Sequence, residues 1–311
     1  MTAVIRTVLG DIDPASLGPT DYHEHLFQRT PLLPQDDLDD ERASAAEAAL
    51  LHRAGAAAIV DATPLGLGRR PAATAAISAA TSLTVVHVTG VHRSAHYSPE
   101  DALLSASVDD LIHAFSTDLL HGMDGTAVRA GVLKVGVSLW EFTPFEGRAL
   151  QAVGRLGGQW GIPVMVHLES GSAAHEVLDE LAAAGCAADR VALAHVDRNP
   201  DPGLHVELAE RGAYLGYDGA ARHQRWPDSM LIDCLQTVVR AGQGERLLLG
   251  GDVARRRRYV SYGGMPGMAY LFDRFLPRVR AAIGDVATDR ILIDNPARWL
   301  RWEPPTPNGL R

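Results

Sequence analysis

The sequence predicts an α/β fold, a single (β/α)8 TIM barrel. Three observations lead to this prediction. Short apolar runs alternate with amphipathic helical patterns, no linker or change of composition divides the 311 residues, and polar residues follow the ends of several apolar runs. A chain of this length could also form two ordinary domains. Because the alternating units continue without a break, we expect one barrel domain that covers residues 1–311.

Eight apolar runs are the predicted strands. They are rich in Val, Ile, Leu and Ala and are mostly continuous rather than alternating with polar residues, which is typical of parallel strands buried on both faces. The runs lie at residues 18–23, 57–63, 83–90, 130–137, 163–169, 191–197, 213–217 and 247–252.

Amphipathic helices are predicted between these runs. Their apolar residues recur at intervals of three and four, the period of a helix with one buried face. The three clearest patterns are Met268, Leu271, Phe272, Phe275, Leu276 and Val279; Leu231, Ile232, Leu235, Val238 and Val239; and Val177, Leu178 and Leu181. A doubly wound open sheet is the alternative, but no GxGxxG turn follows the first strand, so the usual dinucleotide-binding signature is missing.

Composition and charge restrict the class of protein. The chain is 46% hydrophobic and 22% charged, as in ordinary globular proteins, and its net charge of −9 disfavours a nucleic-acid partner. The two cysteines, Cys186 and Cys234, lie far apart, so we expect reduced structural thiols. We see no signal-peptide pattern, and the apolar runs are too short to span a membrane. We therefore expect a cytoplasmic protein that acts on a small molecule without a membrane partner.

Six polar residues lie late in predicted strands or directly after them. His23 and His25 form a His-x-His pair, whose side chains point to the same side of a strand. The other four, each on a different strand, are Lys134, His167, His195 and Asp252. The carboxyl ends of barrel strands meet at one face of the barrel, where active sites lie. We therefore expect these six side chains to converge.

Each of these residues alone has an ordinary structural explanation. A strand histidine is more often a hydrogen-bonded core residue, Asp252 could cap a helix, and Lys134 could be a Schiff-base nucleophile. Together, imidazole and carboxylate ligands suit zinc, manganese, iron or cobalt. Four histidines and an aspartate exceed the three protein ligands of a mononuclear catalytic zinc site. This surplus predicts two metal ions and an activated water, with Asp252 also accepting a proton.

Two other classes of function remain open at this point. A metal-independent barrel lyase would use Lys134 as a Schiff base, but that chemistry has no need of four histidines. A catalytically inactive binding protein is disfavoured because all six of these residues have side chains that can bind a metal or take part in catalysis.

The same residues carry a resemblance to a known family. The segments HEH at residues 23–25, GVLKVG around Lys134, PVMVH ending at His167, AHVDRNPD from His195, LGGDVARR around Asp252 and the terminal ILIDNPARWL resemble the phosphotriesterase-related family of the amidohydrolase superfamily, closest to its lactonase-like branches.

The resemblance implies a distorted TIM barrel with two divalent metal ions, commonly Zn²⁺, with Mn²⁺, Co²⁺ or Fe²⁺ as alternatives. It implies that His23, His25 and Asp252 hold the more buried metal, and that His167 and His195 hold the outer one. It also implies that CO₂ converts Lys134 into a carbamate that bridges both metals. Relatives are often dimers, so a homodimer is left open.

The loop after the last predicted strand bears on the substrate. It contains Arg255, Arg256, Arg257 and Arg258, followed by Tyr262 and two glycines. We expect Arg255 and Arg256, with Tyr262, to bind an anionic group, because guanidinium groups match phosphate and carboxylate geometry. A solvated basic loop is the alternative.

The arginine-rich loop resembles the branch that acts on phosphorylated sugar lactones. We therefore expect opening of a small, anionic lactone by a metal-bridging hydroxide; phosphotriester or N-acyl amino acid hydrolysis are the alternatives. Tyr97 is a further candidate substrate contact, and Arg198 and Asp201 are candidates for the pocket wall or for a turn. His92 and His96 lie beyond their strand, so we do not count them as ligands.

Overall fold

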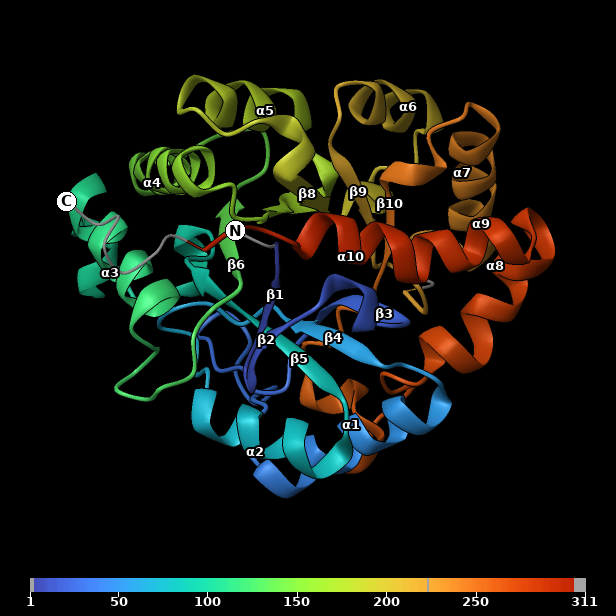
Figure 1. Ribbon diagram of the computed structural model, residues 1–311, viewed down its shortest axis with the longest axis horizontal. Coiled ribbons are helices and arrows are strands. Elements are labelled where there is room, and N and C mark those ends of the chain that lie inside the picture. Colours follow the sequence, from blue (N-terminus) through green and yellow to red (C-terminus); the bar gives the residue numbers. More distant parts are fainter. Residues whose placement is uncertain (1–2, 223, 305–311) are drawn as a thin grey trace.

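The computed structural model describes residues 3–222 and 224–304, in which eight parallel strands form a barrel surrounded by helices. Figure 1 shows the helices arranged around the strands. The predicted TIM barrel is thus confirmed. The barrel strands, in the order in which they pair, are β3 (Thr20–Glu24), β4 (Ala58–Asp61), β5 (Thr84–Gly90), β6 (Val132–Val137), β7 (Val164–Leu168), β8 (Val191–Ala194), β9 (Tyr214–Tyr217) and β10 (Leu247–Leu249).

The helices cover the outside of the barrel and bury their apolar faces against it. They are α1 (Glu41–Ala54), α2 (Pro71–Thr81), α3 (Val108–Leu120), α4 (Pro144–Trp160), α5 (Ala174–Ala183), α6 (Pro202–Glu210), α7 (Asp228–Arg240), α8 (Leu276–Ile283), α9 (Asp285–Asp289) and α10 (Asn295–Leu300). The three helical patterns predicted from the sequence lie on helices except for Met268, which lies in the preceding turn, and Leu271–Phe275, ahead of α8, is a π-helical turn. Among the described residues, no helix has the length and apolarity needed to cross a bilayer.

Alternation along the strands divides the core into an outer layer and a barrel interior. In β6, Leu133 and Val135 pack outward with the helices, whereas Val132 packs inside the barrel. Because strand side chains alternate, Lys134 points to the same side as Val132. In β7, Met165 lies in the interior cluster, and His167 is two residues further along. The sequence therefore places both polar side chains next to the apolar interior cluster, nearer the carboxyl ends of the strands.

The other end of the barrel is closed by terminal segments. A hairpin of β1 (Ile5–Thr7) and β2 (Gly10–Ile12), which the sequence analysis did not predict, lies there together with α10 (Figure 1). Ile5 and the fully buried Trp299 join the interior cluster of the barrel. The polar residues are consequently left at the carboxyl ends of the strands.

The strands β10 and β3 are the two ends of the hydrogen-bonded sheet, so their junction is a seam in the barrel. The main chain is joined there by the bond from Asp252 N–H to the His23 carbonyl, 2.8 Å long. Carboxylates of β3 bind further amides: Glu24 accepts from Val253 N–H at 2.8 Å, and Asp21 accepts from Gly251 N–H at 3.3 Å. The seam therefore depends on side chains next to the His-x-His pair.

Candidate metal centre

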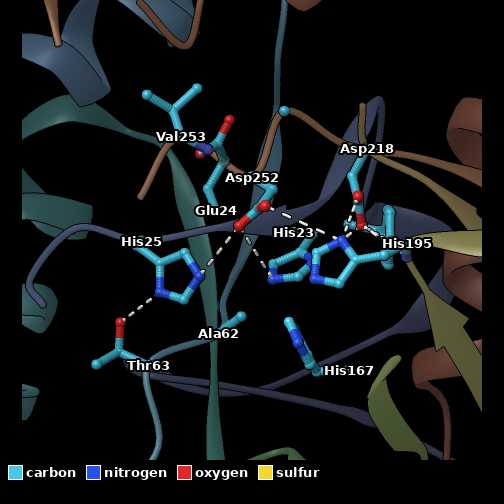
Figure 2. Close-up of polar contacts among 12 residues, drawn as sticks. His23, Glu24, His25, Ala62, Thr63, His167, His195, Asp218, Asp252 and Val253 are labelled. Carbon is cyan, nitrogen blue, oxygen red and sulfur yellow. Dashed lines mark hydrogen bonds and ion pairs between the residues drawn. The ribbon is translucent and has the colours of Figure 1, made fainter. Parts of the chain in front are cut away.

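All six predicted ligands converge at the carboxyl ends of the strands. They line a single cavity of about 150 Å³, and each is buried. Figure 2 shows His23, His25, His167, His195 and Asp252 gathered around one space, although they come from four different segments of the chain. Ligand atoms of His23, His25 and Asp252 lie within 4.8 Å of one another.

Asp218 orients two of the imidazoles at once. It follows β9 directly and accepts hydrogen bonds from His23 Nδ1 at 3.1 Å and from His195 Nδ1 at 2.5 Å (Figure 2). A carboxylate accepts only, so both imidazoles carry a proton on Nδ1 and leave the lone pair of Nε2 free. Burial alone would raise the pKa of the Asp218 carboxyl, but His195 and His23 hold that pKa below its usual value. His23, His195 and Asp218 are also close enough to share a metal, but we interpret them as hydrogen-bonded partners.

His25 is oriented by a different group. Its Nδ1 lies 2.8 Å from the hydroxyl of Thr63, and that hydroxyl donates to the Phe27 carbonyl at 2.6 Å. The hydroxyl proton is used, so the hydroxyl accepts from Nδ1 and the lone pair of Nε2 is again free. Burial lowers the pKa of His25 to about 3. Its imidazole is therefore neutral at physiological pH, as ligation requires.

Asp252 carries the opposite charge at the centre of the site. Its Oδ1 lies 3.5 Å from His25 Nε2 and 3.7 Å from His23 Nε2. Burial alone would raise its pKa, but Arg222 and the surrounding imidazoles hold the pKa of Asp252 well below its usual value. Its φ of 44° is left-handed, a conformation that aspartate adopts more readily than most residues with a Cβ.

The donor set fits a metal cation. Among the described residues, the buried Nε2 of His23 has no hydrogen-bond partner, and it faces the Asp252 carboxylate at 3.7 Å. A buried polar atom without a partner costs free energy, so an unpaired Nε2 at this position indicates that a ligand binds to it. Neutral imidazoles beside a carboxylate are the ligands that zinc and its neighbours in the first transition row prefer.

Lys134 lies beside these ligands. Its Nζ donates to the Ala62 carbonyl at 2.7 Å and is fully buried. Burial lowers the pKa of Lys134 to about 8, so more of the amine is unprotonated near neutral pH than in an exposed lysine. This is the form that a Schiff base or a carbamate requires.

The arginine-rich loop presents two of its four guanidinium groups to the cavity. Arg255 and Arg258 are among the lining residues. Arg256 instead lies over the ring of Tyr262 at 4.5 Å, and Arg257 is exposed; Arg255 and Arg257 each lie 3.6 Å from Asp36. Arg255 is extended and precedes the 3-10 helix Arg256–Arg258, so the main chain turns between the two arginines that line the cavity. We therefore revise the expected anion clamp: Arg258 takes the place of Arg256.

Tyr262 and Tyr97 serve the surrounding structure. The hydroxyl of Tyr262 accepts from the backbone N–H groups of Asp39 and Asp40, at the start of α1. Tyr97 packs edge-on against Phe145, and its hydroxyl accepts from His92 N–H and donates to the Leu65 carbonyl. Both hydroxyl groups are thus committed to the main chain, and the expected substrate contacts of these two tyrosines are revised accordingly.

Several lining residues went unassigned in the sequence. Arg222, Arg93 and Glu169 line the cavity, and so do His92 and His96, which stack with ring centroids 3.8 Å apart. Arg198 also lines it and binds Asp252 at 2.8 Å, whereas Asp201 caps α6. The signal that could have found Asp218 was its place directly after a predicted strand, the same rule that found His195.

Comparison with known proteins identifies the family. The family model of the phosphotriesterase family matches residues 3–300. The chain belongs to the phosphotriesterase family. Enzymes of this family depend on a binuclear metal centre, in agreement with the ligand groups described above.

Individual relatives cover nearly the whole chain. An N-acetyltaurine hydrolase from Danio rerio is 29% identical, over 96% of this chain and 98% of that protein. A phospho-furanose lactonase from Mycoplasmopsis synoviae is also 29% identical, over 96% of this chain and 92% of that protein. The solved structure of a lactonase from Listeria monocytogenes has a TM-score of 0.88 at 28% identity, covering 97% of this chain and 100% of that one. The chain is thus a metal-dependent hydrolase of this family.

Proposed function

We propose that this phosphotriesterase-family hydrolase opens a small anionic lactone, most simply a phosphorylated sugar lactone. The observation that carries the proposal is that Arg258 lines the same cavity as the metal-ligand cluster, beside Arg222, which is paired with Asp252, and Arg255, which lies 3.6 Å from Asp36. Arg258 forms no ion pair with a carboxylate in the described ranges, and burial beside Arg222 lowers its pKa only to about 10, so it stays cationic at neutral pH. A guanidinium without a carboxylate partner is available to bind a phosphate.

Two divalent cations, most simply Zn²⁺, would supply an activated water and polarise the lactone carbonyl. His23, His25 and Asp252 would hold one cation, His167 and His195 the other, and Lys134 both, as its carbamate. The carbamate forms when the unprotonated amine attacks CO₂ and loses a proton, which the lowered pKa of Lys134 favours. Asp252 would accept the proton released when water attacks the carbonyl.

A second candidate is hydrolysis of an N-acylated amino or sulfonic acid. The N-acetyltaurine hydrolase relative favours it, and its anionic substrate would suit the same arginines.

The cytoplasmic location and the homodimer stay predictions.

A substrate comparison tests the proposal. We would measure kcat/KM of the zinc-loaded enzyme for a phosphorylated sugar lactone, its unphosphorylated form, an acyl-homoserine lactone, N-acetyltaurine and paraoxon. We expect the phosphorylated lactone to be preferred. Preference for N-acetyltaurine would select the second candidate, and equal kcat/KM for the phosphorylated and neutral lactones would refute the anion clamp.

Two variants of the loop provide a matched pair. Arg258→Ala should lower kcat/KM for the phosphorylated lactone roughly 10- to 100-fold, because one charge-assisted hydrogen bond is lost. It should barely change kcat/KM for the neutral lactone. Arg256→Ala removes the same charge from the outer side of the loop, so it should leave both values nearly unchanged. Equal effects of the two variants would contradict the assignment of Arg258 to the clamp.

A further inference from the structure

We propose that Glu169 and Arg93 are positioning residues for the outer metal ion, acting through His167. This inference rests on the proposed binuclear site, but it concerns residues that lie outside the ligand set. Glu169 Oε2 lies 3.1 Å from His167 Nε2 and 3.1 Å from Arg93 Nε. One carboxylate oxygen therefore joins a metal ligand to a cation on a neighbouring loop.

The contact determines which nitrogen of His167 is left for a metal. The carboxylate of Glu169 can only accept, so Nε2 of His167 carries the proton and Nδ1 keeps its lone pair. His23, His25 and His195 show the reverse arrangement, with Nδ1 bound and Nε2 free. His167 thus approaches the site from β7 in a different ring orientation and needs a carboxylate of its own. Such outer partners fix the tautomer and the ring angle of metal-binding histidines.

The backbone directly after Glu169 turns sharply. Ser170 and Ala173 adopt left-handed φ values of 57° and 56°, which are unfavourable for residues with a Cβ. The Glu169 carbonyl accepts from Ser172 N–H at 3.2 Å and from Ser172 Oγ at 2.8 Å. Strained backbone persists where the surrounding contacts hold it, and it is concentrated at functional sites. The contacts of the Glu169 carbonyl with Ser172 thus hold the main chain of Glu169 in place beside His167.

Arg93 neutralises Glu169 through an ion pair, without a hydrogen bond from its Nε to any of the described residues. Its backbone N–H donates to His92 Nδ1 at 2.8 Å, and the next residue, Ser94, is held by Glu146 Oε1 at 3.1 Å. The segment that carries Arg93 is therefore fixed. An unpaired carboxylate in this cavity would repel an anionic substrate, and the Arg93 guanidinium offsets its charge. Arg93 consequently binds a carboxylate of the protein, whereas Arg258 remains available for the substrate.

A surface pair in the same chain provides the comparison. His175 Nε2 lies 3.4 Å from Glu207 Oε2, with the side chains 37% and 67% exposed, whereas those of His167 and Glu169 are 8% and 28% exposed. Exposed ion pairs contribute little to stability. Glu207→Ala thus removes a carboxylate from a histidine without affecting the cavity, and it is a matched control for Glu169→Ala.

Metal binding tests the inference without reference to activity. Metal-free wild type, Glu169→Ala, Glu169→Gln and Glu207→Ala would be titrated with Zn²⁺ against a chromophoric chelator, and the visible spectrum followed on Co²⁺ addition. In Glu169→Ala we expect the second equivalent to bind roughly 10- to 100-fold more weakly, with the first unchanged. Glu169→Gln should lose less, because its amide oxygen still accepts from Nε2. Arg93→Ala should resemble Glu169→Gln, and Glu207→Ala should match wild type.

Unchanged affinity for the second equivalent in Glu169→Ala, together with an unchanged Co²⁺ spectrum, would overturn the inference. If Glu169→Ala does not fold, Glu169→Gln decides: a weaker second equivalent supports the inference and wild-type affinity overturns it. A wild-type protein that binds fewer than two equivalents would instead refute the binuclear function. Wild-type binding of two equivalents without hydrolysis of any lactone would refute the proposed substrate alone. The two failures are therefore distinguishable.

Discussion

Replacement of Asp218 by asparagine would test how strongly the metal centre depends on a residue that binds no metal itself. The two carboxylate oxygens of Asp218 serve different partners: Oδ1 accepts from His195 Nδ1, and Oδ2 accepts from His23 Nδ1 and the Tyr22 hydroxyl. An asparagine offers one accepting oxygen and one donating NH₂ group. Whichever way the amide lies, one imidazole meets a donor and must move its proton from Nδ1 to Nε2. That imidazole then has no lone pair on the nitrogen that faces the site.

The size of the effect follows from these contacts. One metal loses an imidazole ligand, and the hydrogen bond lost is charge-assisted, worth about 1.5–3 kcal/mol. This corresponds to a loss of roughly 10- to 100-fold in affinity for that metal, which is also the usual effect of altering a partner of a metal-binding histidine. We expect kcat to fall in parallel, because both metals take part in hydrolysis.

Metal content and turnover would be measured together. Asp218→Asn and wild-type protein would be dialysed against a weak chelator at fixed free Zn²⁺, followed by elemental analysis and a lactonase assay. Asp201→Asn provides the control, because asparagine also caps helices and Asp201 caps α6 on the surface. Retention of two metal equivalents with kcat within about twofold of wild type would refute the reasoning, and so would an equal loss in Asp201→Asn.

Three further predictions concern the proton acceptor, the strand packing and the pH dependence. Asp252→Asn should retain metal by elemental analysis but lose most of kcat, and an unchanged kcat would remove Asp252 from the proton-accepting role. Gly90→Ala should lower the free energy of unfolding by about 2–4 kcal/mol in urea, because φ there is +120° and a Cβ would lie 1.9 Å from the Lys134 carbonyl; Gly147→Ala, on the open face of α4, should be neutral or stabilising, and equal effects would contradict this. Metal-free protein should lose thermal stability as the pH falls below about 6.5. The reason is that His25 has a pKa of about 3 in the folded protein and takes up a proton only when the chain unfolds. A Tm that does not change between about pH 7 and 5 would contradict this prediction.

The position of the metal centre could be predicted because strand ends in a barrel converge whatever the details of the loops. The rule located His167 and Lys134 through their strands alone. The strand limits were less accurate: β8 ends at Ala194, and His195 already has a left-handed φ of 68°. The sequence pattern could not show this bend, because nothing in VALAH distinguishes a strand residue from the first residue of a turn.

The substrate side depended on conformations that the sequence does not specify. Four consecutive arginines are chemically equivalent in the sequence, and only the fold of the loop places Arg255 and Arg258 at the cavity and Arg256 and Arg257 away from it. Glu169 ends the predicted run 163–169, but nothing in the sequence shows that its carboxylate contacts His167 rather than solvent. Side chains on regular strands were thus predictable from periodicity, whereas those on irregular loops required the three-dimensional structure.

The seam between β10 and β3 links the metal centre to the integrity of the barrel. His23 and His25 belong to the first barrel strand and its end, and Asp252 follows the last, so a cation bound by all three would act as a cross-link between the two edges of the sheet. Removal of the metal would leave that junction to the Asp252–His23 main-chain bond and the Asp21 and Glu24 carboxylates. Amide hydrogen exchange in β3 and β10 should therefore accelerate on chelation before it does in β6 and β7, which pair on both sides.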